Sequence, residues 1–324
     1  AVSIDTGTGT YTQANNVDVI AGTGPITVVA DAVTIGTTNG GNNAFSTSGA
    51  LTLKPKTAGR AMSLAGASAF DISATEMARF ATGATGPLVI GDTASTGVLT
   101  IGAALAMGGR TLVLNGGSIT DGGGTTRTIT AQNLTLNANG QIGIGAADGI
   151  DVIANNLSVS TTGGGNAFVR STGAVNLGVG SAAGANVSGT LDLNATGAVT
   201  QTLGTGNVTV GTLQVRTLNN AGAAITLGNA GNNAATVNLQ SRNAAGSANA
   251  AGALQFTDVN GFDVAALATT GNATLSAGGA VTQSGAVAAS GLALTGTGGA
   301  YTLGHAGNAV TTLAANTGSI DYKQ

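Results

Sequence analysis

Residues 208–215 read Val-Thr-Val-Gly-Thr-Leu-Gln-Val, which is two short apolar–polar–apolar triplets joined by Gly-Thr. Alternation with a period of two is typical of a β-strand with one buried and one solvated face. The same three-residue unit recurs from one end of the chain to the other. Examples are Val17-Asp18-Val19, Leu51-Thr52-Leu53, Phe70-Asp71-Ile72, Leu191-Asp192-Leu193, Phe262-Asp263-Val264 and Ile320-Asp321-Tyr322.

Most triplets are followed by Gly, Asn or Ala-Gly, which suit sharp corners because Gly and Asn tolerate a positive φ. Isolated hairpins of such short strands would be only marginally stable. Stacking the strands along an axis pairs every backbone group with the neighbouring coil and joins the apolar side chains into one interior. The pattern therefore predicts an all-β fold, a parallel β-solenoid with Gly/Asn-rich corners, of roughly 11 to 15 coils at two or three triplets per coil.

The composition excludes several other classes of protein. Only 7% of the 324 residues are charged, against about 25% in ordinary domains, and only 3% are aromatic. No apolar run approaches the ~20 residues of a membrane-spanning helix. Abundant Val, Ile, Leu and Thr with three Pro and one Glu argue against disorder. A net charge of −3 with scattered Lys and Arg offers no basic patch for nucleic acid, and the absence of Cys excludes a disulfide framework.

A longer repeat overlies the triplets. The segment Gly197-Ala198-Val199-Thr200-Gln201 returns as residues 279–283, and Thr226-Leu227-Gly228-Asn229-Ala230-Gly231-Asn232 returns as residues 302–308 with His305 in place of Asn229. In both copies the first motif precedes the second by some two dozen residues. The matching order indicates that a block of several coils has been duplicated.

Several of these stretches carry a family resemblance. Residues 72–80 (Ile-Ser-Ala-Thr-Glu-Met-Ala-Arg-Phe), 88–92 (Leu-Val-Ile-Gly-Asp) and 97–101 (Gly-Val-Leu-Thr-Ile), together with the two duplicated motifs, resemble repeats of large exoproteins of the filamentous haemagglutinin type. The resemblance implies a right-handed parallel β-helix from a Gram-negative bacterium, exported by two-partner secretion through an outer-membrane transporter. It also implies a secreted or cell-surface location and a role in adhesion or biofilm formation.

The whole chain, residues 1–324, is expected to form a single continuous β-helix segment and an internal stretch of a longer chain, because neither end shows a capping repeat. Residues 74–80 contain the only plausible helical turn and the sole Glu, Glu76, and the segment near 73–87 is interpreted as an irregular coil or loop. The cluster Lys54, Lys56 and Arg60 is interpreted as a solvated loop.

Candidate chemistry is sparse, and we assign no catalytic, cofactor-binding or metal-ligating residue. Asp residues at triplet centres (Asp18, Asp71, Asp192, Asp263, Asp321) are expected to point singly into solvent, whereas glycoside hydrolysis needs paired carboxylates. The closest pair, Asp148 and Asp151, resembles half of a calcium-binding nonapeptide but stands alone, which favours a solvated corner. His305, the sole His, is expected to be a polar corner residue. The runs Gly122–Gly124 and Gly163–Gly165 are expected to be corners, since they lack a phosphate-loop Lys.

Two further expectations concern surfaces and partners. Thr52, Thr100, Thr135, Thr209, Thr226, Thr274 and Thr302 each centre a triplet, and several stacked on one sheet would make a ladder that could bind glycan; the alternative is that Thr simply suits a solvated strand. The sequence favours an adhesive or structural stalk that contacts a host or neighbouring cell, glycan or matrix. The alternatives are a subunit of a self-associating extracellular filament and, in another class, a polysaccharide-degrading β-helix enzyme.

Overall fold

The computed structural model describes residues 1–36, 44–80, 83–123 and 126–324. The chain divides into two compact units, residues 1–154 with 161–165 and residues 155–160 with 166–324. Nearly all regular structure is parallel β, and the two units together contain about 13 stacked turns among the described residues. The predicted fold class, a β-solenoid of short strands, is confirmed. It stays a prediction that a single β-helix runs without a break from residue 1 to residue 324.

The first unit contains one short helix, α1 (Ala74–Ala78), among its described elements. Its strands are β1 (Val2–Asp5), β2 (Thr10–Gln13), β3 (Val19–Gly22), β4 (Ile26–Val29), β5 (Ala32–Ile35), β6 (Phe45–Thr47), β7 (Leu51–Lys54), β8 (Met62–Leu64), β9 (Phe70–Ile72), β10 (Leu88–Ile90), β11 (Val98–Ile101), β12 (Leu105–Ala106), β13 (Thr111–Gly116), β14 (Ser118–Thr120), β15 (Ile129–Ala138) and part of β16 (Ile150–Thr161).

Parallel register stacks the apolar triplets of the first unit into columns. The two apolar positions of β7 pair with those of β4 and β10, and the columns continue to β13 and β15. Members of these columns have no exposed surface: Ile26, Val28, Leu51, Leu53, Leu88, Ile90, Leu112, Leu114, Leu134 and Leu136. Full burial of each aliphatic side chain contributes about 1.5–3 kcal/mol, so the ladder of columns supplies the core.

The segment near 73–87 interrupts this ladder. Leu51 pairs with Leu88, and Leu88 pairs with Leu112. The stretch of chain from Leu51 to Leu88 is therefore much longer than the stretch from Leu88 to Leu112. The extra residues contain α1, whose capping box joins Ser73 and Glu76: the Ser73 hydroxyl accepts from Glu76 N at 3.2 Å, and Glu76 Oε2 accepts from Ser73 N at 2.8 Å. The segment thus forms the helical turn that residues 74–80 made plausible, within a stretch that interrupts the regular coils.

The prediction for the first triplet of the chain was wrong. Val17 is 45% exposed, and β3 begins only at Val19. Asn16 has a φ of +60°, which turns the backbone just before this stretch and moves the side-chain alternation out of the expected phase.

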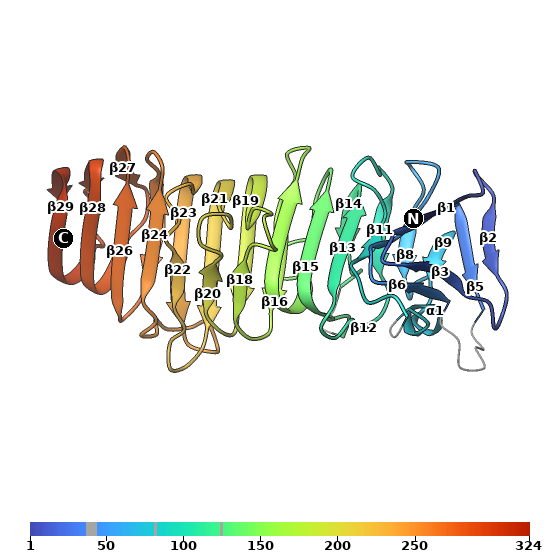
Figure 1. The fold of residues 1–324 in the computed structure, drawn as a ribbon. Helices are drawn as coiled ribbons and strands as arrows, with labels where there is room; N and C mark the ends of the chain where they lie inside the picture. The colour runs from blue at the N-terminus through green and yellow to red at the C-terminus, as the bar shows by residue number, and fades with distance from the viewer. Residues whose placement is uncertain (37–43, 81–82, 124–125) are drawn as a thin grey trace. The chain divides into compact units, whose positions relative to one another are not determined.

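The coils of the second unit stack in chain order (Figure 1), and most strands pair with the strand two places further along the chain. Its strands are residues 155–160 of β16, β17 (Ala167–Ser171), β18 (Val175–Leu177), β19 (Ala185–Ala195), β20 (Val199–Gln201), β21 (Val208–Leu218), β22 (Ile225–Leu227), β23 (Asn233–Arg242), β24 (Leu254–Asp258), β25 (Asp263–Ala268), β26 (Asn272–Ala277), β27 (Ala280–Gln283), β28 (Val287–Leu303) and β29 (Ala309–Tyr322).

The core of this unit is again made of aliphatic columns. One column runs through β17, β19, β21 and β23 as Ala167, Leu191, Leu213 and Val237, and a second as Val169, Leu193, Val215 and Leu239. All eight are at most 1% exposed. Few aromatic side chains are needed. Phe256 and Phe262 are buried, and they pack edge-on at 5.2 Å between ring centroids. Among the described residues, no helix has the length and apolar character that crossing a bilayer requires.

Candidate functional site

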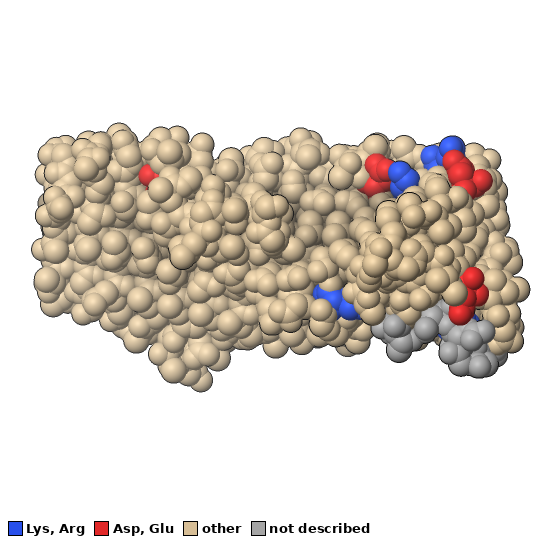
Figure 2. Space-filling view, viewed as in Figure 1, with Lys and Arg blue, Asp and Glu red and all other residues tan. Residues whose placement is uncertain are grey.

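The basic cluster of the first unit is held by carboxylates from other coils. Lys54 Nζ lies 2.6 Å from Asp92 Oδ2, and Lys56 Nζ lies 2.8 Å from Asp5 Oδ2. Arg60 Nε donates to the backbone oxygen of Asp31 at 2.9 Å. Figure 2 shows acidic and basic side chains side by side in small groups, with a few isolated charged side chains elsewhere on this face. The expectation of a merely solvated loop was incomplete, because ion pairs tie this loop to coils before and after it.

These contacts lower the pKa of two carboxyls, Asp92 through the hydrogen bond from Lys54 and Asp5 through that from Lys56. Each carboxylate therefore stabilises the fold above its ordinary pKa of 3.8, and the stabilisation is lost as the pH falls through the lower folded value. We expect Asp92→Asn to lose less stability than the wild type as the pH falls below 3.8, because the variant has no carboxyl at this position to protonate. Urea midpoints measured from pH 6 to pH 2 check this, and parallel acid limbs in the two proteins would contradict it.

The carboxylates at triplet centres do not behave alike. Asp192 was expected to point into solvent but is only 3% exposed. Its Oδ1 accepts from Asn194 Nδ2 at 2.8 Å, and its Oδ2 accepts from Gln214 Nε2 on the next coil at 2.6 Å. Desolvation raises the pKa of Asp192, and the positive charge of Arg216 opposes this rise. The solvent prediction was wrong for Asp192 because long side chains on adjacent strands cover the outer face.

Asp148 and Asp151 occupy different environments. Asp148 lies in a tight turn, where its N donates to Gly145 O at 2.9 Å, and fits the expected corner. Asp151 is 8% exposed within β16, so the expectation of a solvated corner was wrong for it. Within the part of the chain that the structure describes, no three His, Cys, Asp or Glu side chains gather as metal ligands would.

The glycine runs were expected to form corners. Gly122, Gly123 and Gly164 have φ values of +67°, +88° and +84°, as sharp turns require. Gly124 lies outside the described residues.

The seven threonines that centre triplets do not form the ladder that was considered as a glycan-binding surface. Thr52 pairs with Thr27 and Val89, and Thr226 is separated from Thr274 by Gln255. Register instead aligns three other threonines on the second unit, Thr190, Thr212 and Thr236. The triplet pattern alone does not say how many residues each coil holds, so it could not say which threonines would be neighbours.

The duplicated motifs of the second unit converge on a pair of amides, of which Asn232 is buried and Gln201 is partly buried. Gln201 Nε2 donates to Asn232 Oδ1 at 2.6 Å, and Asn232 Nδ2 donates back to Gln201 Oε1 at 3.2 Å. Asn232, which has no exposed surface, also accepts from Val208 N at 2.9 Å and donates to Leu227 O at 3.1 Å. All four hydrogen-bonding positions of the Asn232 amide are thus used. We call the Gln201–Asn232 pair an amide brace.

The second copy builds the same amide brace. Gln283 Nε2 donates to Asn308 Oδ1, and Asn308 Nδ2 donates back to Gln283 Oε1 at 3.2 Å. Asn308 accepts from Val287 N at 2.9 Å, as Asn232 does from Val208. The backbone N of His305 donates to Gln283 Oε1 at 3.2 Å, which matches the contact of Asn229 with Gln201. His305 is exposed, so the prediction of a polar corner residue is confirmed.

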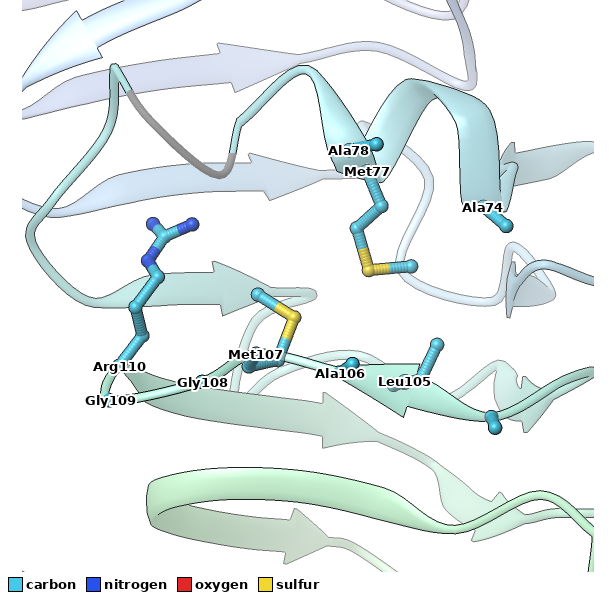
Figure 3. A pocket seen from close by; sticks show the side chains of 10 residues that line it. Ala74, Met77, Ala78, Leu105, Ala106, Met107, Gly108, Gly109 and Arg110 are labelled. Atoms are coloured by element: carbon cyan, nitrogen blue, oxygen red, sulfur yellow. The ribbon is translucent and has the colours of Figure 1, made fainter.

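A separate hollow of about 500 Å³ lies beside α1 in the first unit (Figure 3). Met77 projects into it from α1 and Met107 from the segment after β12, with Arg110 at the opposite end from Leu105. Burial lowers the pKa of Arg110, but guanidinium groups stay charged at neutral pH.

One family model matches part of the chain. It covers residues 164–240 and 251–317 and is described as "Repeats of unknown function" (DUF5649). These two segments are similar to DUF5649 repeats. No curated protein and no solved structure shows significant similarity to the chain.

Each DUF5649 segment contains one complete amide brace, Gln201 with Asn232 in the first and Gln283 with Asn308 in the second. The match therefore follows the duplication seen in the sequence. The sequence showed that these Gln and Asn residues recur, but their direct contact was missed. The signal was there: Gln closes the first motif and Asn closes the second in both copies.

Proposed function

We propose that this β-solenoid is a structural, adhesive segment of a Gram-negative surface exoprotein, one that spaces or displays binding regions or takes part in a biofilm matrix. The chain is a repeat protein, and its fold fits a structural role. The observation that carries the proposal is the amide brace. The Gln and Asn side chains that recur in the two DUF5649 segments form hydrogen bonds between coils. A stack of coils that must resist mechanical force needs such bonds.

Three further features support this proposal. The ion pairs Lys54–Asp92 and Lys56–Asp5 also join coils. The composition, with 7% charged residues and no Cys, fits a chain exported unfolded. The resemblance to filamentous haemagglutinin-type repeats supplies the outer-membrane transporter as the export partner and a cell surface, glycan or matrix as the contact.

The test is to locate the protein on cells that produce it. Antibodies raised against the purified chain should label intact cells, and protease added outside should remove the label. Loss of the gene should reduce attachment to a surface. Labelling that appears only after permeabilisation would reject the surface location, and unchanged attachment would reject the adhesive role. Electron microscopy of the purified protein then separates a stalk segment, seen as discrete particles, from a filament subunit.

The proposal includes no catalytic activity. We expect the purified chain to leave acidic polysaccharides uncut in the presence of calcium, because paired carboxylates or a calcium-binding acid cluster would be needed for cleavage. Reducing-end release and absorbance of unsaturated products are the two readouts. Release above that of heat-denatured protein from any of a panel of pectate, alginate and hyaluronate would reject this part of the proposal.

A further inference from the structure

The hollow beside α1 combines apolar walls with a cation at one end. Met77 and Met107 are each 7% exposed and Leu105 is 2% exposed, and they form the walls together with Ala74 and Ala78 of α1. Methionine side chains adapt to irregular apolar shapes because they are unbranched and polarizable. The apolar part of the lining can therefore take a slender alkyl chain, while Arg110 and the backbone of Gly108 and Gly109 supply polar groups.

The charge at the end of the hollow has no acidic partner among the described residues. Arg110 Nη1 donates to Phe80 O at 3.2 Å and Nη2 to Gly86 O at 3.1 Å. Both acceptors are neutral backbone oxygens. Arg110 Nε is buried and has no hydrogen-bond partner. A guanidinium has five N–H donors, so three remain. Buried polar groups without a partner are rare in folded proteins and often mark the position of an ion or ligand.

A purely structural role for Arg110 would be to hold the loop at Phe80 and Gly86. That role accounts for two hydrogen bonds but leaves the positive charge uncompensated at the edge of an apolar hollow. Lys54 and Lys56 differ, because each pairs with an aspartate carboxylate. At Arg110 an anion would supply the missing charge.

We propose that the hollow beside α1 binds a single-chain alkyl carboxylate, with the carboxylate on Arg110 and the alkyl chain between Met77 and Met107. A carboxylate is planar and can accept two parallel N–H bonds from a guanidinium. The volume of about 500 Å³ falls within the usual range for small-molecule sites. This site does not depend on the function proposed above.

The chain provides its own reporters for a test. It contains three methionines, of which Met77 and Met107 line the hollow, while Met62 lies fully buried in β8. With ¹³C-methyl methionine, NMR spectra of the whole chain contain three assignable methyl signals. Titration with octanoate should move the signals of Met77 and Met107 and leave that of Met62 in place. Movement of all three signals together, or of none, would overturn the site.

Ligand series separate the contributions of charge and chain. Each added methylene from hexanoate to decanoate should tighten binding about fourfold, because burial of a methylene is worth ~0.8 kcal/mol. Octanol, which has the chain without the charge, should bind at least roughly tenfold more weakly than octanoate. Equal affinity for octanol and octanoate, or no dependence on chain length, would overturn the proposal.

Two variants test the two ends of the site separately. Arg110→Gln should weaken octanoate binding on the order of tenfold and leave octanol binding unchanged. Because Arg110 also holds the loop, Ala78→Leu serves as a second variant. Ala78 is exposed on α1 and lines the hollow, and its side chain carries no polar atom, so leucine should fill the space and weaken the binding of both ligands. Wild-type affinity for octanoate in Ala78→Leu would overturn the proposed position of the chain.

Discussion

Replacing Asn232 with alanine should lower the free energy of unfolding of the second unit by about 3–5 kcal/mol, which is a large fraction of the stability of an ordinary domain. The substitution removes four hydrogen bonds at once. The Val208 N–H, the Leu227 carbonyl and both ends of the Gln201 amide lose their contact with Asn232. Each buried polar group left without a partner costs about 1–3 kcal/mol.

The neighbouring Asn233 provides the control. It is exposed, and its side chain makes only a long 3.4 Å contact with Asn260 Nδ2. Asn233→Ala should therefore change stability by no more than about 0.5 kcal/mol. Urea denaturation followed by far-UV circular dichroism compares the two variants, and hydrogen exchange localises the loss to the coils of Val208 and Leu227. If the two substitutions cost the same, the amide brace is not a principal stabilising element.

A double-mutant cycle isolates the brace itself. Gln201→Ala alone should also destabilise, and the loss in Gln201→Ala/Asn232→Ala should be smaller than the sum of the two single losses, because they share two hydrogen bonds. Additive losses would indicate that the two amides stabilise the fold independently.

Gly285→Ala is expected to have the other large effect. A Cβ at this position would lie 1.8 Å from Ala265 O and 2.9 Å from Ala265 C, both backbone atoms of the adjacent coil. Gly285 N donates to Val264 O at 3.1 Å, and Val264 and Ala266 on either side of Ala265 both pair with β23. Ala265 therefore has little room to move aside, and the coils must separate locally. We expect a loss of at least about 3 kcal/mol, beyond ordinary overpacking.

Gly304→Ala is the matched control for this substitution. Gly304 has no atom within 4 Å of its Cβ position and no positive φ. Alanine there should be neutral, or stabilise slightly by restricting the unfolded chain. Denaturant midpoints and hydrogen exchange in β25 and β28 provide the measurement. Similar midpoints for both variants would show that the corner at Gly285 opens easily.

The core could be predicted from the sequence because alternation assigns each side chain to one face of a strand. Leu51 and Leu53, for example, lie inside and Thr52 outside without any knowledge of their neighbours. The pairs between coils could not be predicted in this way. Lys56 reaches Asp5 from a distant part of the sequence, and Asp192 is covered by Gln214 from the next coil. Such contacts depend on coil lengths, which the triplets do not specify.

The helical turn α1 was accessible to sequence reasoning, since Ser73 and Glu76 have the spacing of a capping box. The surrounding β pattern outweighed this signal. The hollow beside α1 was not accessible, because Met77 and Met107 lie far apart in the sequence and Arg110 resembles any isolated basic residue. Only the long interval between the paired strands β7 and β10 brings α1 over this part of the first unit.

The unequal coils of the second unit bear on how a repetitive chain finds one register. Val237 pairs with Val264, whereas Ala273 pairs with Leu292, so the first of these coils is clearly longer than the second. A nascent coil that docked one repeat too early would align its aliphatic side chains but misplace the amide brace and the close-packed corner glycines. The irregular coil lengths thus specify the register. Neighbouring repeats bury similar apolar side chains, but only one alignment also places the amide brace and every corner glycine correctly.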